Sequence, residues 1–85
     1  METRVAVLAI IVRDGNSVAA LNDLLHQYGS SVIGRMGVPY REKGVNIISV
    51  AMDAPGDVIS ALSGKIARLP GITAKTVYAP EEALK

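Results

Sequence analysis

Residues 4–12 read RVAVLAIIV, and this stretch decides the fold. After Arg4 both alternating sets of side chains are apolar: Val5, Val7, Ala9 and Ile11 form one set, and Ala6, Leu8, Ile10 and Val12 form the other. Successive side chains of a strand point to opposite faces of a sheet, so neither face of this strand suits water. The stretch is therefore predicted to be a central strand.

Three further strands follow from the same reasoning. Residues 45–52 (VNIISVAM) are also largely apolar in both alternating sets and predict a second central strand. Residues 31–38 alternate and precede Pro39, which lacks a backbone N–H and is tolerated at the edge or end of a sheet. Residues 72–78 predict a fourth strand.

Apolar side chains at helical spacing predict two helices between these strands. Their stripes are Val18, Leu21, Leu25 and Tyr28 in the first helix, and Val58, Leu62, Ile66 and Leu69 in the second. The first helix is expected to be capped by Asn16 or Ser17 and to end at Gly29, with Asn22 nearer its polar side. The second is expected to start within residues 53–57 and to stop at Pro70-Gly71, because proline cannot continue a helix.

The element order βαββαβ predicts an α+β, ferredoxin-like sandwich. Its antiparallel sheet would have the strand order 4-1-3-2, with both helices on one face. This order places the two strands that are apolar on both sides in the middle of the sheet. One such domain is expected to span residues 1–85, with a frayed tail over residues 80–85.

Composition narrows the classes of function. The chain has no cysteine, which excludes disulfides and thiolate chemistry and favours a cytoplasmic location. Its formal net charge of +1, with the signs interspersed, lacks the clustered cations of a nucleic-acid-binding surface, so direct nucleic acid binding is not expected. The longest apolar run, residues 5–12, is far shorter than the roughly 20 residues of a membrane helix, so no membrane partner is expected.

Two helices cover only one face of a four-stranded sheet. We expect Val32, Met36, Ile48 and Val50 to face the helices. The open face would then carry Ile33, Val45, Ile47, Ala51, Val77 and one apolar set of residues 4–12, bordered by Arg35 and Lys75. Monomeric proteins rarely expose apolar patches of this kind, so the chain is predicted to form a homo-oligomer, a dimer or tetramer, through its sheet faces.

Two stretches are candidates for binding a ligand, and each also has a purely structural interpretation. Residues 34–42 place two glycines in one strand with three cationic or hydroxyl groups nearby, which suits an anion but also suits a bulged edge strand. Residues 14–17 place free amides at a helix start, which capping explains equally well. The candidate ligand-binding residues are Asp14, Gly15, Asn16, Gly34, Arg35, Gly37 and Arg41.

No catalytic residue, metal ligand set or cofactor is predicted. Residues 61–66 (ALSGKI) are only superficially similar to a phosphate-binding loop, because the required first glycine and the Ser or Thr after Lys65 are missing. His26 is the only histidine and is interpreted as a surface residue. No nucleophile elbow or paired carboxylates indicate an enzyme.

Three stretches carry a resemblance to a known family: residues 34–42 (GRMGVPYRE), 61–65 (ALSGK) and 70–72 (PGI). They resemble the iron-only hydrogenase system regulators, and the likeness spans nearly the whole chain. The family is similar to ACT domains and to the carboxy-terminal domain of nickel-responsive repressors, which implies a ferredoxin-like fold and oligomers built through the sheets. It also implies a role in the expression or assembly of iron-only hydrogenase.

The family often has Leu-Gly after its Gly-Lys pair, where this chain has Ile66-Ala67. Nickel sensing would need several histidines, and the chain has one, so it is not expected here. The leading hypothesis is an oligomeric regulatory module that senses a small ligand, such as an amino acid or another anion, between subunits. The alternatives are a transcriptional regulator that binds DNA directly and a small ferredoxin-like enzyme.

Overall fold

The computed structural model describes residues 2–80. Its elements follow the order β1 (Arg4–Val12), η1 (Gly15–Ser17), α1 (Val18–Gln27), η2 (Gly29–Ser31), β2 (Val32–Tyr40), η3 (Arg41–Lys43), β3 (Val45–Ala54), α2 (Gly56–Ala67) and β4 (Ile72–Tyr78). The predicted βαββαβ order is confirmed, with three short 3-10 turns added. The frayed tail expected after Ala79 falls largely on residues 81–85, which lie outside the described residues.

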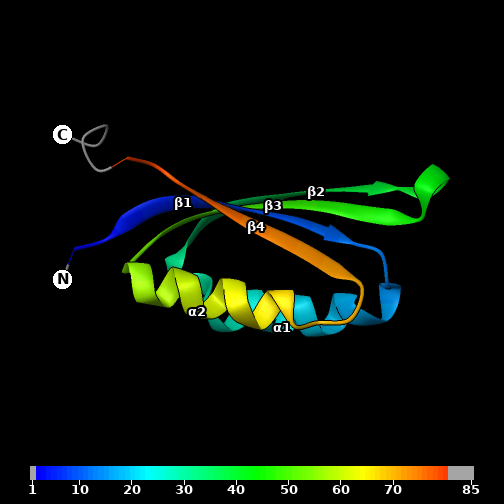
Figure 1. The fold of residues 1–85 in the computed structure, drawn as a ribbon, viewed down its shortest axis with the longest axis horizontal. Helices are drawn as coiled ribbons and strands as arrows, with labels where there is room; N and C mark the ends of the chain where they lie inside the picture. The colour runs from blue at the N-terminus through cyan, green and yellow to red at the C-terminus, as the bar shows by residue number, and fades with distance from the viewer. Residues whose placement is uncertain (1, 81–85) are drawn as a thin grey trace.

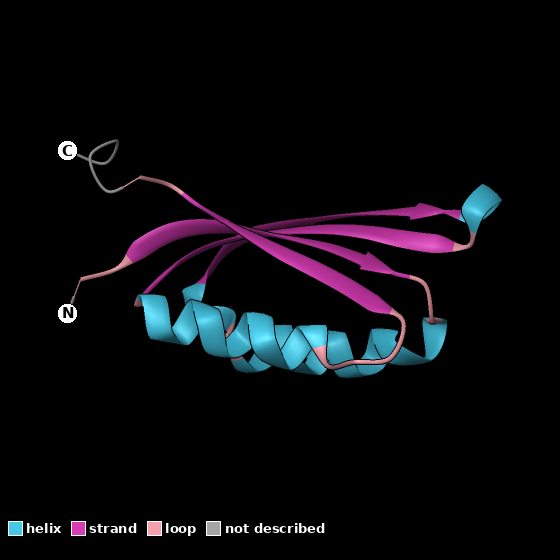
Figure 2. Ribbon diagram, in the orientation of Figure 1, coloured by secondary structure: helices cyan, strands magenta, loops and turns pink. Residues whose placement is uncertain are grey.

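The four strands form one antiparallel sheet in the order β2-β3-β1-β4, which is the predicted 4-1-3-2 order viewed from the other end. β1 and β3 therefore occupy the centre, as their two apolar faces require. Both α-helices lie side by side on one face (Figure 1). Among the described residues, the opposite face carries no helix except the short η3 at the tip of the β2–β3 hairpin (Figure 2).

The hydrophobic core lies between the sheet and the two helices. Alternate residues of β1 and β3 point into it, and they meet both helices there: Ala6, Leu8, Ile10, Val12, Ile48, Val50, Met52, Ala54, Leu21, Leu25, Ile59, Leu62 and Ile66 are all buried. The predicted stripe of α1 is confirmed, with Leu21 and Leu25 buried at its centre. The stripe of α2 missed Ile59, which is buried while the neighbouring Val58 is only partly so.

The turn before α1 differs from the sequence prediction. Asp14, not Asn16 or Ser17, accepts the capping hydrogen bond, from the Asn16 amide at 3.0 Å. The buried Ser17 stands at the start of α1 but donates its hydroxyl to the Pro70 carbonyl instead, at 2.6 Å. The short side chain thus joins two turns that are 53 residues apart, and α1 begins without a side-chain cap.

The predicted facing of β2 is wrong for two residues because the strand contains a bulge. Its pairing with β3 shifts register between Val32 and Gly34, so Ile33 is an extra residue in the strand. Beyond the bulge Arg35 pairs with the buried Val50 and points toward the helices, whereas Met36 pairs with Ser49 and points away from them. Arg35 therefore does not border the open face, and Met36 belongs to it.

Candidate functional site

The face of the sheet opposite the helices is apolar. Each large hydrophobic side chain that is exposed in the described chain lies on it: Val7, Ile11, Ile33, Met36, Val38, Tyr40, Ile47 and Val77. We call this set the open face. The exposed fraction of its side chains reaches 66% at Met36, and folded monomers rarely gather so many exposed apolar side chains on one face.

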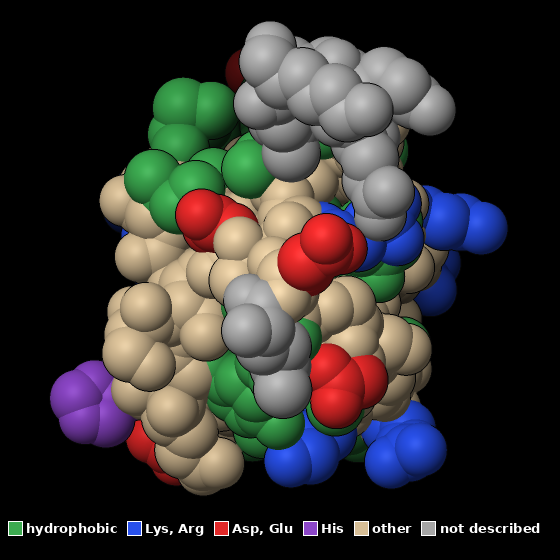
Figure 3. All heavy atoms as spheres, turned by 90° about the vertical axis from the view of Figure 1, so that its left-hand side faces the viewer, with side chains coloured by type: hydrophobic (Ala, Val, Ile, Leu, Met, Phe, Trp, Pro, Cys, Tyr) green, Lys and Arg blue, Asp and Glu red, His purple; other side chains and the backbone are tan. Residues whose placement is uncertain are grey.

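The side chains of the open face line up with their neighbours across the sheet. Val38, Ile47, Ile11 and Thr73 lie side by side on the four strands, and this row contains no charge. The next row, Met36, Ser49, Ala9 and Lys75, ends in a charge on the edge strand β4. The predicted interface residues Ile33, Ile47 and Val77 belong to the open face, and Val45 and Ala51 lie among them, partly buried. In Figure 3, hydrophobic side chains reach the surface in the upper left of the view, on the sheet side of the molecule.

A second feature lies on the helix side, where α1 and the edge strand β2 separate. Two cavities, of about 390 Å³ and 230 Å³, lie along this seam. Asn22 of α1 and Arg35 of β2 line both cavities, and Arg35 Nη2 donates a hydrogen bond to Asn22 Oδ1 at 3.2 Å between them. We call the two cavities together the α1–β2 groove.

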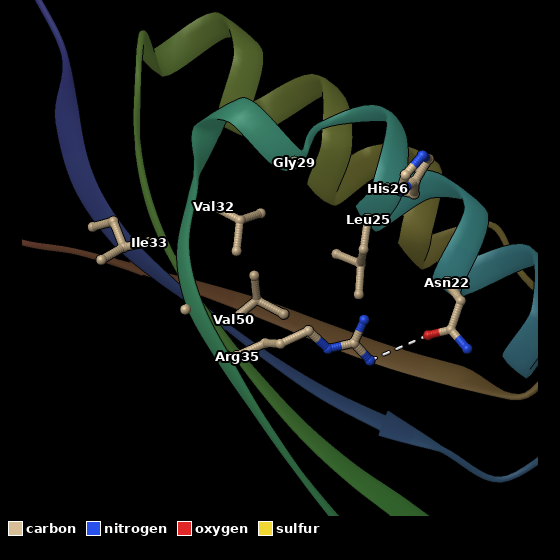
Figure 4. A pocket seen from close by; sticks show the side chains of 9 residues that line it. Asn22, Leu25, His26, Gly29, Val32, Ile33, Arg35 and Val50 are labelled. Carbon is tan, nitrogen blue, oxygen red and sulfur yellow. Dashed lines mark hydrogen bonds between the residues drawn. The ribbon is translucent and has the colours of Figure 1, made fainter.

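The larger cavity has an apolar floor and a polar rim. Leu25, Val32 and Val50 point into it, and Arg35 reaches across it to Asn22 (Figure 4). Ile33 borders the cavity, but its side chain points the other way, because it directly follows Val32 in the strand (Figure 4). The bulge then turns the guanidinium of Arg35 into the groove and puts Met36 on the open face.

The structure brings together only part of the predicted ligand set. Gly34 and Arg35 line the larger cavity, and Gly37 lines the smaller one. The segment Asp14–Asn16 lines neither cavity, because it packs against the turn at Gly71. Arg41 lies in η3 at the hairpin tip and lines neither cavity.

Sequence reasoning missed the helix residues of the groove. The helical pattern predicts Asn22 nearer the polar side of the first helix, yet its side chain accepts a hydrogen bond from Arg35. It stands four residues after Val18 and three before Leu25, so helical spacing already placed it beside the apolar stripe. His26 and Gly29 also line the larger cavity, where a surface position was predicted for His26, which is indeed exposed.

The described residues offer no other obvious chemical centre. No cluster of three or more His, Asp or Glu side chains that could hold a metal ion occurs within residues 2–80. The stretch 61–65, which has a superficial likeness to a phosphate-binding loop, lies inside α2, as expected from the sequence. None of the helices in the described part of the chain has the length and apolar character needed to cross a membrane.

Comparison with known proteins gives one family and two informative solved structures. A family described as "TM1266-like: Iron-only hydrogenase system regulator, putative" matches residues 4–76. The structure of the uncharacterized protein TM1266 from Thermotoga maritima is 34% identical, with a TM-score of 0.89, over 93% of this chain and 100% of that chain. No match was found among curated proteins.

The C-terminal domain of the MgtC protein from Mycobacterium tuberculosis is also similar in structure. It is 12% identical, with a TM-score of 0.71, and the match covers 92% of this chain and 89% of that chain. At this identity the similarity establishes a shared fold and nothing about activity.

Proposed function

Because the chain belongs to the TM1266-like family of iron-only hydrogenase system regulators, we propose that it works in the cytoplasm as a homo-oligomeric regulatory module that senses a small ligand. One observation carries the proposal. All the large hydrophobic side chains that the described residues expose lie on the open face.

The open face suits a second copy of the same chain. Its row Val38, Ile47, Ile11 and Thr73 is free of charge across all four strands. Lys75 lies at the β4 edge of the neighbouring row, and Asp53 lies near the end of β3. A dry centre with charged groups around it is the usual anatomy of a protein interface. Two copies related by a two-fold axis bury the same apolar surface on each chain, and this is the commonest way to close such an assembly.

The chain's small size adds to the argument. A domain of about 85 residues buries only some 60–65% of the surface that its unfolded chain exposes, so its own core gives modest stability. The core here is a single layer between the sheet and two helices. Pairing of two sheets would add a second apolar layer on the other side of β1 and β3.

Ligand sensing finds support in the position of β2. This edge strand sends Val32 and Arg35 into the α1–β2 groove, while Ile33 and Met36, its neighbours along the chain, belong to the open face. A ligand in the groove and a partner on the open face would therefore both act on the same few residues. Such a ligand shifts assembly only if it binds one state more tightly than the other.

The assembly is tested by sedimentation equilibrium on the wild-type protein and two lysine variants. Ile47→Lys places a charge at the centre of the open face, and Ala61→Lys places the same charge on the exposed side of α2. We expect wild type and A61K to sediment at a multiple of 8.9 kDa at micromolar concentration, and I47K to sediment at 8.9 kDa. A monomeric wild type, or an I47K protein that keeps its assembly, would contradict the proposal.

The regulatory role is tested in a cell that contains both the chain and an iron-only hydrogenase. We expect deletion to change the hydrogenase transcript level or the amount of active enzyme. The I47K allele should reproduce the deletion, and the A61K allele should behave as wild type. Unchanged transcript and enzyme levels after deletion would show that the chain does not regulate this system.

A further inference from the structure

The α1–β2 groove has a definite chemical character. Its larger cavity, of about 390 Å³, lies within the range of roughly 300–1,000 Å³ that is usual for small-molecule sites, at the small end. Val32 and the small exposed part of Leu25 supply apolar contact at its floor, and the fully buried Val50 lies beneath them. Within residues 2–80, no Asp or Glu lines either of the two cavities, so Arg35 gives this part of the groove a net positive charge.

Arg35 has hydrogen-bonding capacity left for a ligand. A guanidinium carries five N–H donors in a planar fork, and it matches a carboxylate in a bidentate geometry. Among the described residues its one hydrogen bond runs from Nη2 to Asn22 Oδ1, at 3.2 Å. That bond holds the side chain across the groove between the two cavities, because Arg35 and Asn22 line both.

The groove does not suit a highly charged anion. Leu25, His26 and Gly29 line the larger cavity at the C-terminal end of α1, where the helix dipole is negative. A phosphate dianion would meet one guanidinium and this unfavourable dipole. A single negative charge is balanced by Arg35 alone, and the apolar floor favours an aliphatic group attached to it.

We propose that the α1–β2 groove binds a small organic carboxylate with a short branched aliphatic part, the carboxylate pairing with Arg35 and the aliphatic part contacting Val32 and the exposed edge of Leu25. The inference rests on the proposed function, because it names the site and the ligand class of the module. It assigns Asn22 a positioning role, since its carbonyl oxygen holds the guanidinium in place.

The test uses 3-methylbutanoate as the probe, with the uncharged 3-methylbutanamide, acetate and inorganic phosphate as matched comparisons. Binding is followed by amide chemical shifts in the full chain. We expect 3-methylbutanoate to bind at millimolar concentration or below and to shift the resonances of α1 and β2 around Asn22, Gly34 and Arg35. The three comparison compounds should each bind at least ten-fold more weakly.

Three variants locate the site. Arg35→Gln removes the cation and should weaken binding at least ten-fold. Asn22→Asp keeps the side-chain shape but places a carboxylate beside Arg35 that competes with the ligand, so it should also weaken binding. Arg41→Gln removes a cation at the hairpin tip, outside both cavities, and should bind as wild type does. Since all three side chains are exposed, we expect the three variants to unfold at the wild-type denaturant concentration.

Several results would overturn this assignment. They are the absence of binding to wild type at 20 mM 3-methylbutanoate, R35Q binding that equals wild type, and phosphate binding that equals or exceeds carboxylate binding. The sedimentation experiment is independent of these results. An assembled protein that does not bind the acid disproves this ligand site alone, and a monomer that binds it disproves the assembly alone.

Discussion

Gly71 lies where two turns of the protein meet, and replacing it with alanine is a sharp test of that contact. Its φ of +69° is in the left-handed region, and a Cβ built there would lie 2.5 Å from Asp14 Cβ and 2.9 Å from the Asp14 amide nitrogen. Arg13 also donates its amide to the Gly71 carbonyl at 2.7 Å, so the backbone cannot easily move away. Both the conformation and the space at this residue require glycine.

The cost can be worked out in two parts. A non-glycine residue in the left-handed region costs roughly 1–2 kcal/mol. Added bulk in a packed place costs about 1–3 kcal/mol more, because Asp14 or the Pro70-Gly71 turn must move. We therefore expect Gly71→Ala to lower the free energy of unfolding by about 2–5 kcal/mol, a large share of the roughly 5–15 kcal/mol of a typical domain.

Alanine substitutions at two other glycines separate the cost of the left-handed conformation from the cost of added bulk. Gly44 has a φ of +66° but nothing within 4 Å of a built Cβ, so Gly44→Ala should cost only the left-handed conformation, roughly 1–2 kcal/mol. Gly64 lies inside α2 and also has nothing within 4 Å, so Gly64→Ala should stabilise the protein by about 0.5–1 kcal/mol. The expected order of stability is G64A, wild type, G44A and then G71A.

The assay is urea unfolding of the four proteins at one protomer concentration, because assembly makes apparent stability depend on concentration. The midpoint urea concentrations are compared at one shared m-value, the slope of the unfolding free energy against urea concentration. A changed m-value would indicate a change in the folded or unfolded state. If G71A proved as stable as G44A, the contact between Gly71 and Asp14 would be refuted. A G64A protein that is less stable than wild type would show that a Cβ at residue 64 of α2 does not have open space around it.

Two further substitutions test the core and the turn contact. Ser17→Ala removes the hydrogen bond to the Pro70 carbonyl, and we expect it to lower the free energy of unfolding by about 1 kcal/mol. The melting temperature should fall by roughly 4–8 °C. An unchanged melting temperature would argue against the bond. Leu8→Ala opens a cavity at a side chain that is 0% exposed, and we expect a loss of about 2–5 kcal/mol in urea unfolding. Asp23→Ala on the exposed side of α1 is its control and should stay within about 0.5 kcal/mol; a loss at Leu8 no larger than this would place Leu8 outside the core.

Much of the architecture could be predicted from the sequence. The bounds of β1 and β4 are confirmed as Arg4–Val12 and Ile72–Tyr78, and the central position of β1 and β3 follows from their two apolar faces. The central position of β1 and β3 is predictable because both alternating sets of side chains in each strand are largely apolar, a pattern that can be seen in the sequence. The left-handed conformation expected at Gly71 is confirmed, but α2 ends at Ala67, so Leu69 and Gly71 lie in the turn before β4 and not in the helix or at its cap.

The candidate site was harder to predict because it depends on one extra residue. The two glycines of β2 indicated a bulged edge strand, and the structure confirms a bulge at Val32/Gly34. The alternation of side chains did not show that the extra residue is Ile33, yet this position decides that Arg35 faces α1 and Met36 faces away. A shift of one residue in a strand moves each following side chain to the other face. The width of the gap between α1 and β2 is set by tertiary packing, so spacing along the chain could indicate Asn22 but not the groove.

The central claim is that the open face joins copies of this chain, and intermolecular NOEs test it most directly. In a sample that mixes methyl-labelled and unlabelled protein, we expect NOEs between chains at the methyl groups of Ile11, Val38 and Ile47. Exposed alanines of the helices, such as Ala19 and Ala61, should show none. A sample without intermolecular NOEs at millimolar concentration, or with NOEs only at the helix methyl groups, would contradict the claim.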